Sequence, residues 1–261
     1  MDSVTRFEGL AAHYDRSRPT PPRALTDLLR QWIAVDRPDV VDLGAGSGLA
    51  TELWSGQAAS VTAIEPGADM RAIAGQRLAT LPDREIFALV DAPAEVTGLP
   101  DACADVVVAS QAMHWFDPAR VIPEIARLLR PGGVFAAIDC DFPPAVLAAA
   151  DAAYDDFQYA MGHLEVSNAL QPAKTAKREH LGNLSRSGLF RRTTEICLHK
   201  EETGDGQRLV DIALSQGGAK AALDAGFTEE DLAVTGLRAI AATIPADTPF
   251  WWTYRVRLAW K

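Results

Sequence analysis

Short apolar runs alternate with amphipathic segments along the first half of the chain. Apolar residues at helical spacing predict a helix over 23–35. Further apolar runs predict strands over 40–43, 60–65, 85–90, 105–110 and 134–138, separated by helices over 48–55, 68–78 and 120–129. The run at 105–110 is nearly continuous, as in a strand that is covered on both faces. This alternation favours a mostly parallel sheet with helices on both sides.

The pattern changes after Cys140. Residues 144–187 and 206–242 have helical patterns, whereas 192–201 and 250–260 resemble strands, the last being rich in aromatic and β-branched residues. We therefore expect an α/β fold built as a three-layer sandwich, with a seven-stranded, mostly parallel sheet and an antiparallel last strand. The expected organisation is a single domain over residues 1–261, with 144–187 inserted as a helical cap.

Charge and composition restrict the possible partners. The 261 residues include 25 Lys and Arg against 35 Asp and Glu, a formal net charge of −10, which argues against nucleic-acid binding. We interpret the loose basic group Lys174, Lys177 and Arg178 as a solvated face. No run is apolar enough for a membrane span or a signal peptide. The three cysteines lie far apart and favour reduced thiols in a cytoplasmic protein.

The segment VVDLGAGSGLA, residues 40–50, contains the most informative motif. Gly44, Gly46 and Gly48 alternate after a strand that ends in Asp42, so the backbone can turn sharply and approach a ligand. A dinucleotide-binding G-x-G-x-x-G motif is excluded because Leu49 occupies the third glycine position, and no G-K-[ST] phosphate-binding loop is present. The alternative is a purely structural connection between a strand and a helix.

Polar residues stand at the ends of the next predicted strands. Glu65 ends the second predicted strand about twenty residues beyond the glycines, where an acid can bind ribose hydroxyls, although it could also serve the following helix terminus. Asp91 follows the third strand, QAMHWFDP (111–118) follows the fourth, and LLRPGG (128–133) precedes the fifth. Each signal is weak alone, but their order over 40–138 makes them specific together.

These motifs resemble class I S-adenosylmethionine-dependent methyltransferases over about half of the chain. FEGLAAHYDRSRP (7–19) and QAMHWFDP narrow the resemblance to small-molecule enzymes with an "HWF" signature, the trans-aconitate-methyltransferase-like proteins. The resemblance implies a Rossmann-like fold that binds S-adenosyl-L-methionine and releases S-adenosyl-L-homocysteine. It implies cofactor contacts by Asp42, Gly44, Ala45, Gly46, Gly48, Glu65, Pro66, Met70, Asp91, Ala92 and Gln111, with Tyr14 and Arg18 in an N-terminal lid or, alternatively, a surface helix.

The predicted chemistry consists mainly of positioning an acceptor in line with an activated methyl group. Gln111 is expected to face the methyl group, and His114 is a candidate general base; its alternative role is to hold the loop or the cofactor carboxylate. Trp115 could wall the acceptor pocket, and Asp139 and Asp141 could bind a polar or cationic acceptor. A magnesium site is disfavoured because no Asp stands at position 111, so no metal is expected.

The function predicted from these residues is methyl transfer to O, N or C of a small molecule. The alternatives are a cofactor-binding protein of the same fold that performs another step, such as a cyclisation, or a regulator. The intact glycine turn, Glu65 and Asp91 argue against a degenerate domain. We expect a small-molecule acceptor as the partner, no nucleic acid and no membrane, and a monomer or homodimer in the cytoplasm.

Overall fold

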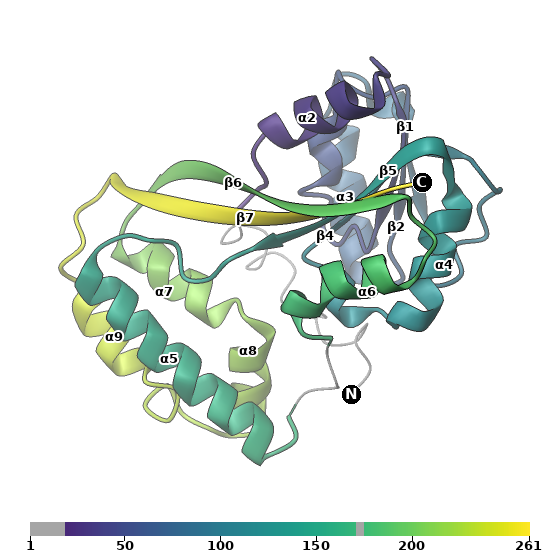
Figure 1. The fold of residues 1–261 in the computed structure, drawn as a ribbon. Helices are drawn as coiled ribbons and strands as arrows, with labels where there is room; N and C mark the ends of the chain where they lie inside the picture. Colours follow the sequence, from purple (N-terminus) through teal and green to yellow (C-terminus); the bar gives the residue numbers. More distant parts are fainter. Residues whose placement is uncertain (1–18, 171–174) are drawn as a thin grey trace. The chain divides into compact units, whose positions relative to one another are not determined.

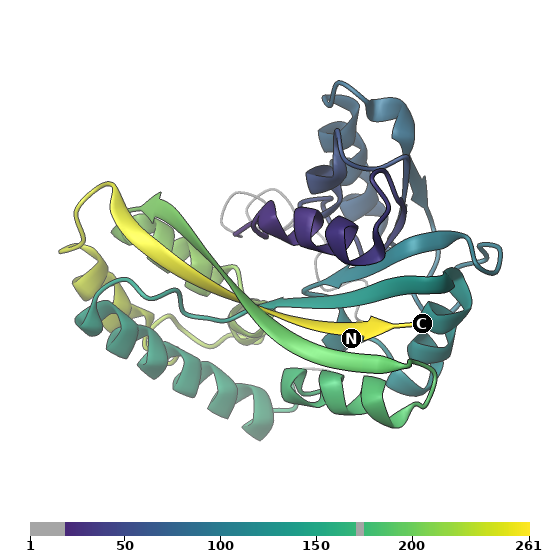
Figure 2. The same ribbon diagram turned by 45° about the horizontal axis from the view of Figure 1, so that its top comes forward.

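Seven strands form one sheet in the order β3-β2-β1-β4-β5-β7-β6 within the described part of the chain, which in this computed structural model comprises residues 19–170 and 175–261. The strands are β1 (Asp39–Leu43), β2 (Ser60–Ile64), β3 (Phe87–Val90), β4 (Ala104–Ser110), β5 (Leu129–Cys140), β6 (Arg192–Gly204) and β7 (Thr248–Trp260). Strands β1 to β5 pair in parallel, and β7 runs antiparallel to β5 (Figure 2). This confirms the predicted mostly parallel, Rossmann-like sheet.

The helices occupy the segments between the strands (Figure 1). The described α-helices are α2 (Ala24–Ile33), α3 (Ala68–Ala79), α4 (Pro118–Leu128), α5 (Ala148–Ser167), α6 (His180–Arg186), α7 (Gly206–Leu214), α8 (Gly217–Asp224) and α9 (Val234–Ala241). Short 3-10 helices cover η2 (Thr51–Trp54), η3 (Arg84–Ile86), η4 (Met113–Trp115) and η5 (Lys177–Glu179). None of the described helices is both long and apolar enough to span a membrane.

The helix expected over 48–55 is wrong. The chain forms only the four-residue η2 there, and the first residue of the expected helix, Gly48, has φ 83°, which a right-handed helix cannot include. The N–H of Gly48 instead donates to the carbonyl of Ala45 at 3.0 Å, which closes a turn. The dipole of the four-residue η2 is much smaller than that of the helix expected over 48–55.

The described residues divide into two compact units. One contains residues 20–140, 175–198 and 254–261, and the other contains residue 19 together with 141–170 and 199–253. In the second unit, α5 packs against α8 and α9, and α7 packs against α9. Tyr154 and Phe157 of α5 are fully buried there, and the Tyr154 hydroxyl accepts a hydrogen bond from Gln216 Nε2 at 2.9 Å. Each unit therefore has its own packed interior.

Strands β1 and β4 form the centre of the first unit. Val106 to Ala109 are almost completely buried, as the continuous apolar run predicted, and α4 presents Val121, Ile122 and Ile125 to the same core. Because all strands from β1 to β5 are parallel, their carboxyl ends meet at one edge of the sheet. Ligands of open α/β sheets bind at this edge.

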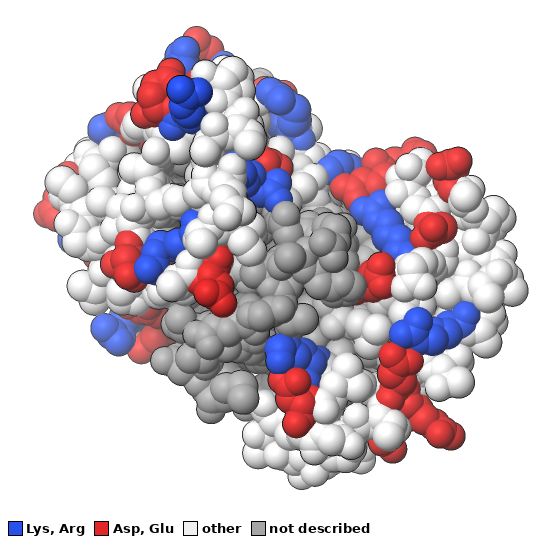
Figure 3. All heavy atoms as spheres, turned by 180° about the vertical axis from the view of Figure 1, so that it is seen from behind, with Lys and Arg blue, Asp and Glu red and all other residues white. Residues whose placement is uncertain are grey.

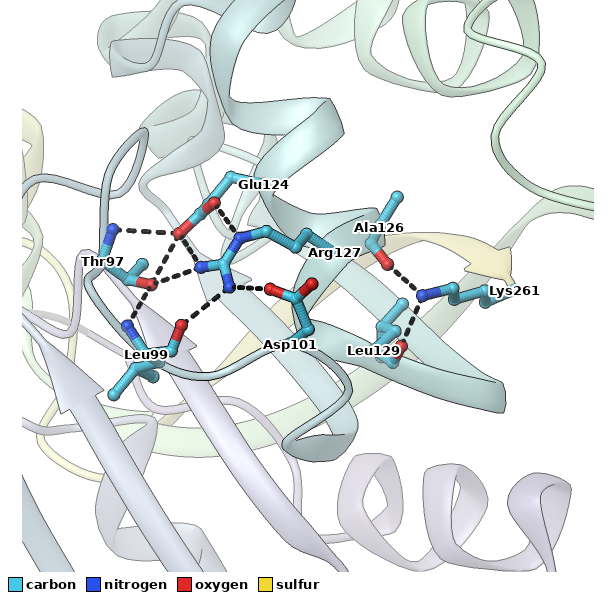
Figure 4. A network of polar contacts seen from close by, with 8 residues as sticks. All are labelled: Thr97, Leu99, Asp101, Glu124, Ala126, Arg127, Leu129 and Lys261. Carbon is cyan, nitrogen blue, oxygen red and sulfur yellow. Dashed lines mark hydrogen bonds and ion pairs between the residues drawn. The ribbon is translucent and has the colours of Figure 1, made fainter.

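Ion pairs and hydrogen bonds connect helix α4 to the loop between β3 and β4 (Figure 4). Arg127 contacts Glu124 and Asp101 at 2.7 Å each, and both the amide and the hydroxyl of Thr97 donate to Glu124. The Arg127 guanidinium and these donors lower the pKa of Glu124 to about 2. Acidic and basic side chains are similarly interspersed on the face shown in Figure 3.

Candidate active site

The glycine turn after β1 is fixed to the end of β2. The N–H groups of Gly44 and Ala45 both donate to the carbonyl of Ile64, at 2.9 and 3.0 Å. A Cβ at Gly44 would lie 2.8 Å from Ala112 Cβ and 2.9 Å from Phe116 Cζ, so no larger residue fits without displacement. At Gly46 a Cβ would meet nothing within 4 Å. Considering residues 19–170 and 175–261, the turn is therefore packed at its start and open at Gly46, where a ligand can approach the backbone.

Glu65 connects this turn to the start of α3. Its Oε2 accepts from the N–H of Gly46 at 2.9 Å, and its Oε1 accepts from the N–H of Gly67 at 2.8 Å. Burial raises the pKa of Glu65 against the effect of these two donors. Each carboxylate oxygen can accept a further hydrogen bond, so the side chain can still bind vicinal hydroxyls.

Asp42 lies beneath the turn and is completely buried. Its Oδ2 accepts from Thr51 Oγ1 at 2.6 Å, whereas Oδ1 has no hydrogen-bond partner among the described residues. Burial, with a smaller contribution from the charge of Glu65, raises the pKa of Asp42 to about 6. A buried carboxylate oxygen that lacks a donor suits a cationic or N–H-bearing ligand group.

Asp91, one of the predicted cofactor contacts, directly follows β3. Its side chain is 68% exposed, and its Oδ2 contacts Arg71 Nη2 at 2.7 Å. Arg71 also donates to the carbonyl of Glu65 at 2.8 Å, so it bridges the ends of β2 and β3. Met70 and Ala92 are buried beside this edge. The sequence analysis missed Arg71, which lies on the predicted helix without any motif.

Gln111 and His114 follow β4 and lie close to the glycine turn, because Ala112 between them packs against Gly44. Gln111 has φ 54°, and its N–H donates to the carbonyl of Ile138 at 2.8 Å. Its Oε1 accepts from Lys177 Nζ at 2.8 Å. His114 follows in η4, with its ring 5.1 Å from that of Trp115. The interpretation of Lys177 as part of a solvated face is therefore wrong.

A buried polar cluster surrounds Asp139 at the end of β5. Arg257 Nη1 lies 2.7 Å from Oδ2 and Lys177 Nζ lies 3.3 Å from Oδ1. His114 Nδ1 is 3.8 Å from Oδ1, and His180 Nε2 is 3.7 Å from Oδ2. Asp139, Arg257 and His180 are almost inaccessible to solvent. These residues come from four segments that are distant in sequence.

The same cluster contains three residues that could ligate a metal ion. Ligand atoms of His114, Asp139 and His180 lie within 4.8 Å of one another. However, Arg257 and Lys177 each bring a positive charge to the Asp139 carboxylate, which disfavours a dication there.

The remaining predicted residues are placed as follows. Asp141 belongs to the second unit, where its N–H donates to the carbonyl of Thr253 at 2.8 Å. Pro66 lies between Glu65 and Gly67 in the turn that leads to α3. Tyr14 and Arg18 lie outside the described residues.

The first half of the chain is similar in sequence to known methyltransferases. A family model described as "Methyltransferase domain" matches residues 41–137. An uncharacterised methyltransferase of Mycobacterium tuberculosis is 40% identical over 133 residues, 51% of each chain. A trans-aconitate 2-methyltransferase of Azoarcus sp. is 36% identical over 119 residues, 44% of each chain. The chain thus spans about half the length of the curated relatives that it matches.

A solved structure extends the similarity beyond this half. A protein from Anaeromyxobacter dehalogenans, described as a type II methyltransferase, superposes with a TM-score of 0.66 at 26% identity. The match covers 93% of this chain and 96% of that chain. Motif order, sheet topology and these similarities agree. Residues 41–137 therefore match the methyltransferase domain family, and the similarity to methyltransferases covers about half of the chain in sequence and 93% of it in structure.

Proposed function

We propose that this protein transfers a methyl group from S-adenosylmethionine to an O, N or C atom of a small molecule. The observation that carries the proposal is the glycine turn, which is open at Gly46, held by Glu65 and underlain by the buried carboxylate of Asp42. The open turn lets a ligand approach the backbone, Glu65 can accept hydrogen bonds from hydroxyl groups, and Asp42 can bind a cationic group. A purely structural connection between strand and helix would need no buried carboxylate oxygen without a donor.

The cofactor's chemical groups match the donors and acceptors along the sheet edge. Gly44, Ala45, Gly46 and Gly48 would line its methionine half, with Asp42 toward the amino group. Glu65, beside Pro66, would accept hydrogen bonds from the ribose, and Asp91, Met70 and Ala92 would surround the adenine. When bound, S-adenosylmethionine supplies a methyl group that is already activated for transfer. The protein's task is then to hold an acceptor in line and to exclude water.

The acceptor would bind next to Gln111. Gln111 is fixed at its backbone by Ile138 and at its side chain by Lys177, so its amide has a defined place at the carboxyl end of β4. His114 and Trp115 follow within four residues and would form one wall of the acceptor site. A fixed wall of this kind favours positioning of a small acceptor.

The proposed partner is therefore a small molecule rather than nucleic acid or membrane, in a monomer or homodimer. The net charge of −10 supports this because phosphate backbones would be repelled. Cys103, Cys140 and Cys197 form no disulfide within the described part of the chain, which fits the cytoplasmic location that we propose.

The test is titration calorimetry of the purified protein with S-adenosylmethionine and S-adenosylhomocysteine. We expect both to bind, and Glu65→Gln to weaken both about tenfold or more, since the amide loses the charge that accepts the ribose hydroxyls. The matched control is Asp105→Asn. The Asp105 carboxylate, like that of Glu65, accepts a hydrogen bond from a backbone N–H, that of Asp39 at 2.9 Å, but it lies near the start of β4, on the opposite edge of the sheet.

Binding that falls equally in both variants would show that general destabilisation, not the ribose contact, is being measured. Absence of binding by the wild-type protein at millimolar ligand would refute the proposed function. Once binding is established, candidate acceptors can be screened by mass spectrometry for a gain of one methyl group.

A further inference from the structure

We propose that Asp139 is a positioning residue that keeps a proton on Nδ1 of His114, so that Nε2 can accept a proton from a hydroxyl or amine acceptor. The inference rests on the proposed methyl transfer, because it names the acceptor class of that same site. It concerns residues of a single compact unit, since Gln111, His114, Asp139, Lys177 and Arg257 all belong to it.

The orientation of His114 is the first observation. Its Nδ1 is buried and lies 3.8 Å from Asp139 Oδ1, while the side chain as a whole keeps 13% exposure. The exposed part of the ring is therefore not the edge that faces Asp139. The backbone is held as well, because the carbonyl of His114 accepts from the N–H of Thr175 at 3.1 Å. A distance of 3.8 Å is longer than a hydrogen bond, but at this separation the charge of the Asp139 carboxylate still favours the tautomer with its proton on Nδ1 before any ligand binds.

The orientation of Asp139 is the second observation. Arg257 fixes Oδ2 at 2.7 Å, and Glu195 Oε2 in turn lies 2.6 Å from Arg257 Nε. Lys177 approaches Oδ1 at 3.3 Å and also binds Gln111. The carboxylate is thus held in one orientation, with Oδ1 toward His114. Lys177 further connects this carboxylate to the residue that we place at the methyl group.

The charges around the cluster favour a proton on Nδ1 over a metal ion. Arg257 and Lys177 already bring one positive charge to each oxygen of Asp139. His180 is fully buried on the other side, and burial lowers its pKa, so it adds no further charge near neutral pH. A neutral N–H donor needs no additional anion, whereas a dication would. Arg257 and Lys177 offset the negative charge of Asp139, so Asp139 raises the basicity of His114 little. We therefore assign to Asp139 the control of the tautomer and orientation of the His114 ring.

The chemical consequence is a restriction on the acceptor. An acceptor oxygen or nitrogen forms the bond to the methyl carbon with its lone pair, while the carbon–sulfur bond breaks and its electron pair stays on sulfur. The proton on the attacking atom passes to Nε2 of His114 and then to solvent. A carboxylate acceptor has no such proton, so an oriented base would give it no advantage. The structure thus favours hydroxyl and amine acceptors.

The test is a ¹⁵N spectrum of the full-length, histidine-labelled protein without ligands at pH 8. The signals that disappear in His114→Gln belong to His114. We expect these signals to show a protonated Nδ1 and an unprotonated Nε2 in the wild type, and a shift toward the other tautomer in Asp139→Asn. Asp105→Asn serves as the control, because it removes another arginine-paired carboxylate and should leave the His114 tautomer unchanged. Circular dichroism checks that each variant is folded.

Two outcomes would overturn the inference. One is a wild-type His114 with its proton on Nε2, a result that stands even if Asp139→Asn does not fold. The other is binding of Co²⁺ with a visible absorption band that is lost in Asp139→Asn, because Nδ1 would then be a metal ligand. Calorimetry with S-adenosylmethionine separates this inference from the proposed methyl transfer. A protein that shows the expected tautomer but binds no cofactor would contradict only the proposed function. A protein that binds the cofactor but has its proton on Nε2 of His114 would contradict only this inference.

Discussion

Asp42 keeps a carboxyl group in the core of the sheet, where the described part of the chain offers no donor to one of its oxygens. Its pKa is raised from 3.8 to about 6, first by burial and then by the charge of Glu65, while Thr51 acts in the opposite direction. Between these two pH values the folded protein retains a proton that the unfolded chain has lost. The free energy of unfolding therefore falls as pH rises from about 4 to about 6. This cost is consistent with a residue kept for a ligand rather than for stability.

We predict that Asp42→Asn removes this pH dependence, because asparagine does not titrate. Relative to wild type, the variant should gain about 2 kcal/mol in free energy of unfolding between pH 4 and pH 7, on the basis of about 1.4 kcal/mol per pKa unit. Urea unfolding of both proteins at the two pH values measures this gain. A difference that stays constant with pH would mean that Asp42 is ionised throughout. In parallel, the variant should bind S-adenosylmethionine more weakly.

At the scale of elements, the sequence predicted the strands of the parallel sheet well. Their apolar runs are short and are bounded by Gly, Pro or Asp, so length and boundaries both indicate strands. The turn after β1 was misjudged because helical spacing alone does not reveal three positive φ angles. Glu65 and Gln111 were predicted as site residues because each follows a strand, and the structure places the carboxyl ends of these strands at the same edge.

The polar cluster around Asp139 could not be predicted as a whole. Asp139 itself stood out at the end of a strand, but Lys177, Glu195 and Arg257 lie 38 to 118 residues further along the chain. Only the pairing of β5 with β7, which sets Asp139 opposite Arg255, brings this part of β7 to the carboxylate. A lysine among other basic residues carries no local signal for such a contact. Long-range register was thus the missing information.

The glycine turn gives a prediction that separates strain from ligand contact. Gly46 and Gly56 both have positive φ and open space for a Cβ, so alanine at either should cost about 1–2 kcal/mol of stability. We expect only Gly46→Ala to weaken S-adenosylmethionine binding as well, since its methyl group would occupy the open side of the turn. Gly44→Ala should cost more stability than either, because of Ala112 and Phe116. Thermal unfolding and calorimetry of the three variants test this. Equal binding by Gly46→Ala and Gly56→Ala would place the ligand elsewhere.

At the scale of the whole molecule, all described residues that we assign to the cofactor fall within one compact unit. Asp42, Glu65, Asp91 and Gln111 belong to residues 20–140, whereas α5, α7, α8 and α9 belong to the other unit. A ligand stabilises the part of a protein whose unfolding destroys its site. Cofactor binding should consequently stabilise the unit that contains the site more than the other unit, even though β6 and β7 contribute residues to both.

We predict that S-adenosylhomocysteine at about 100 times its dissociation constant slows amide exchange in β1, β2 and β4 by up to about 100-fold, which corresponds to about 2.7 kcal/mol. Amides of α7 and α9 should exchange at unchanged rates. Hydrogen exchange followed by mass spectrometry, with and without ligand, measures both. The Glu65→Gln variant at the same ligand concentration is the control and should show a smaller effect in the strands. Equal slowing in α7 and α9 would show that the two units unfold together, because the binding free energy would then be shared by the entire chain.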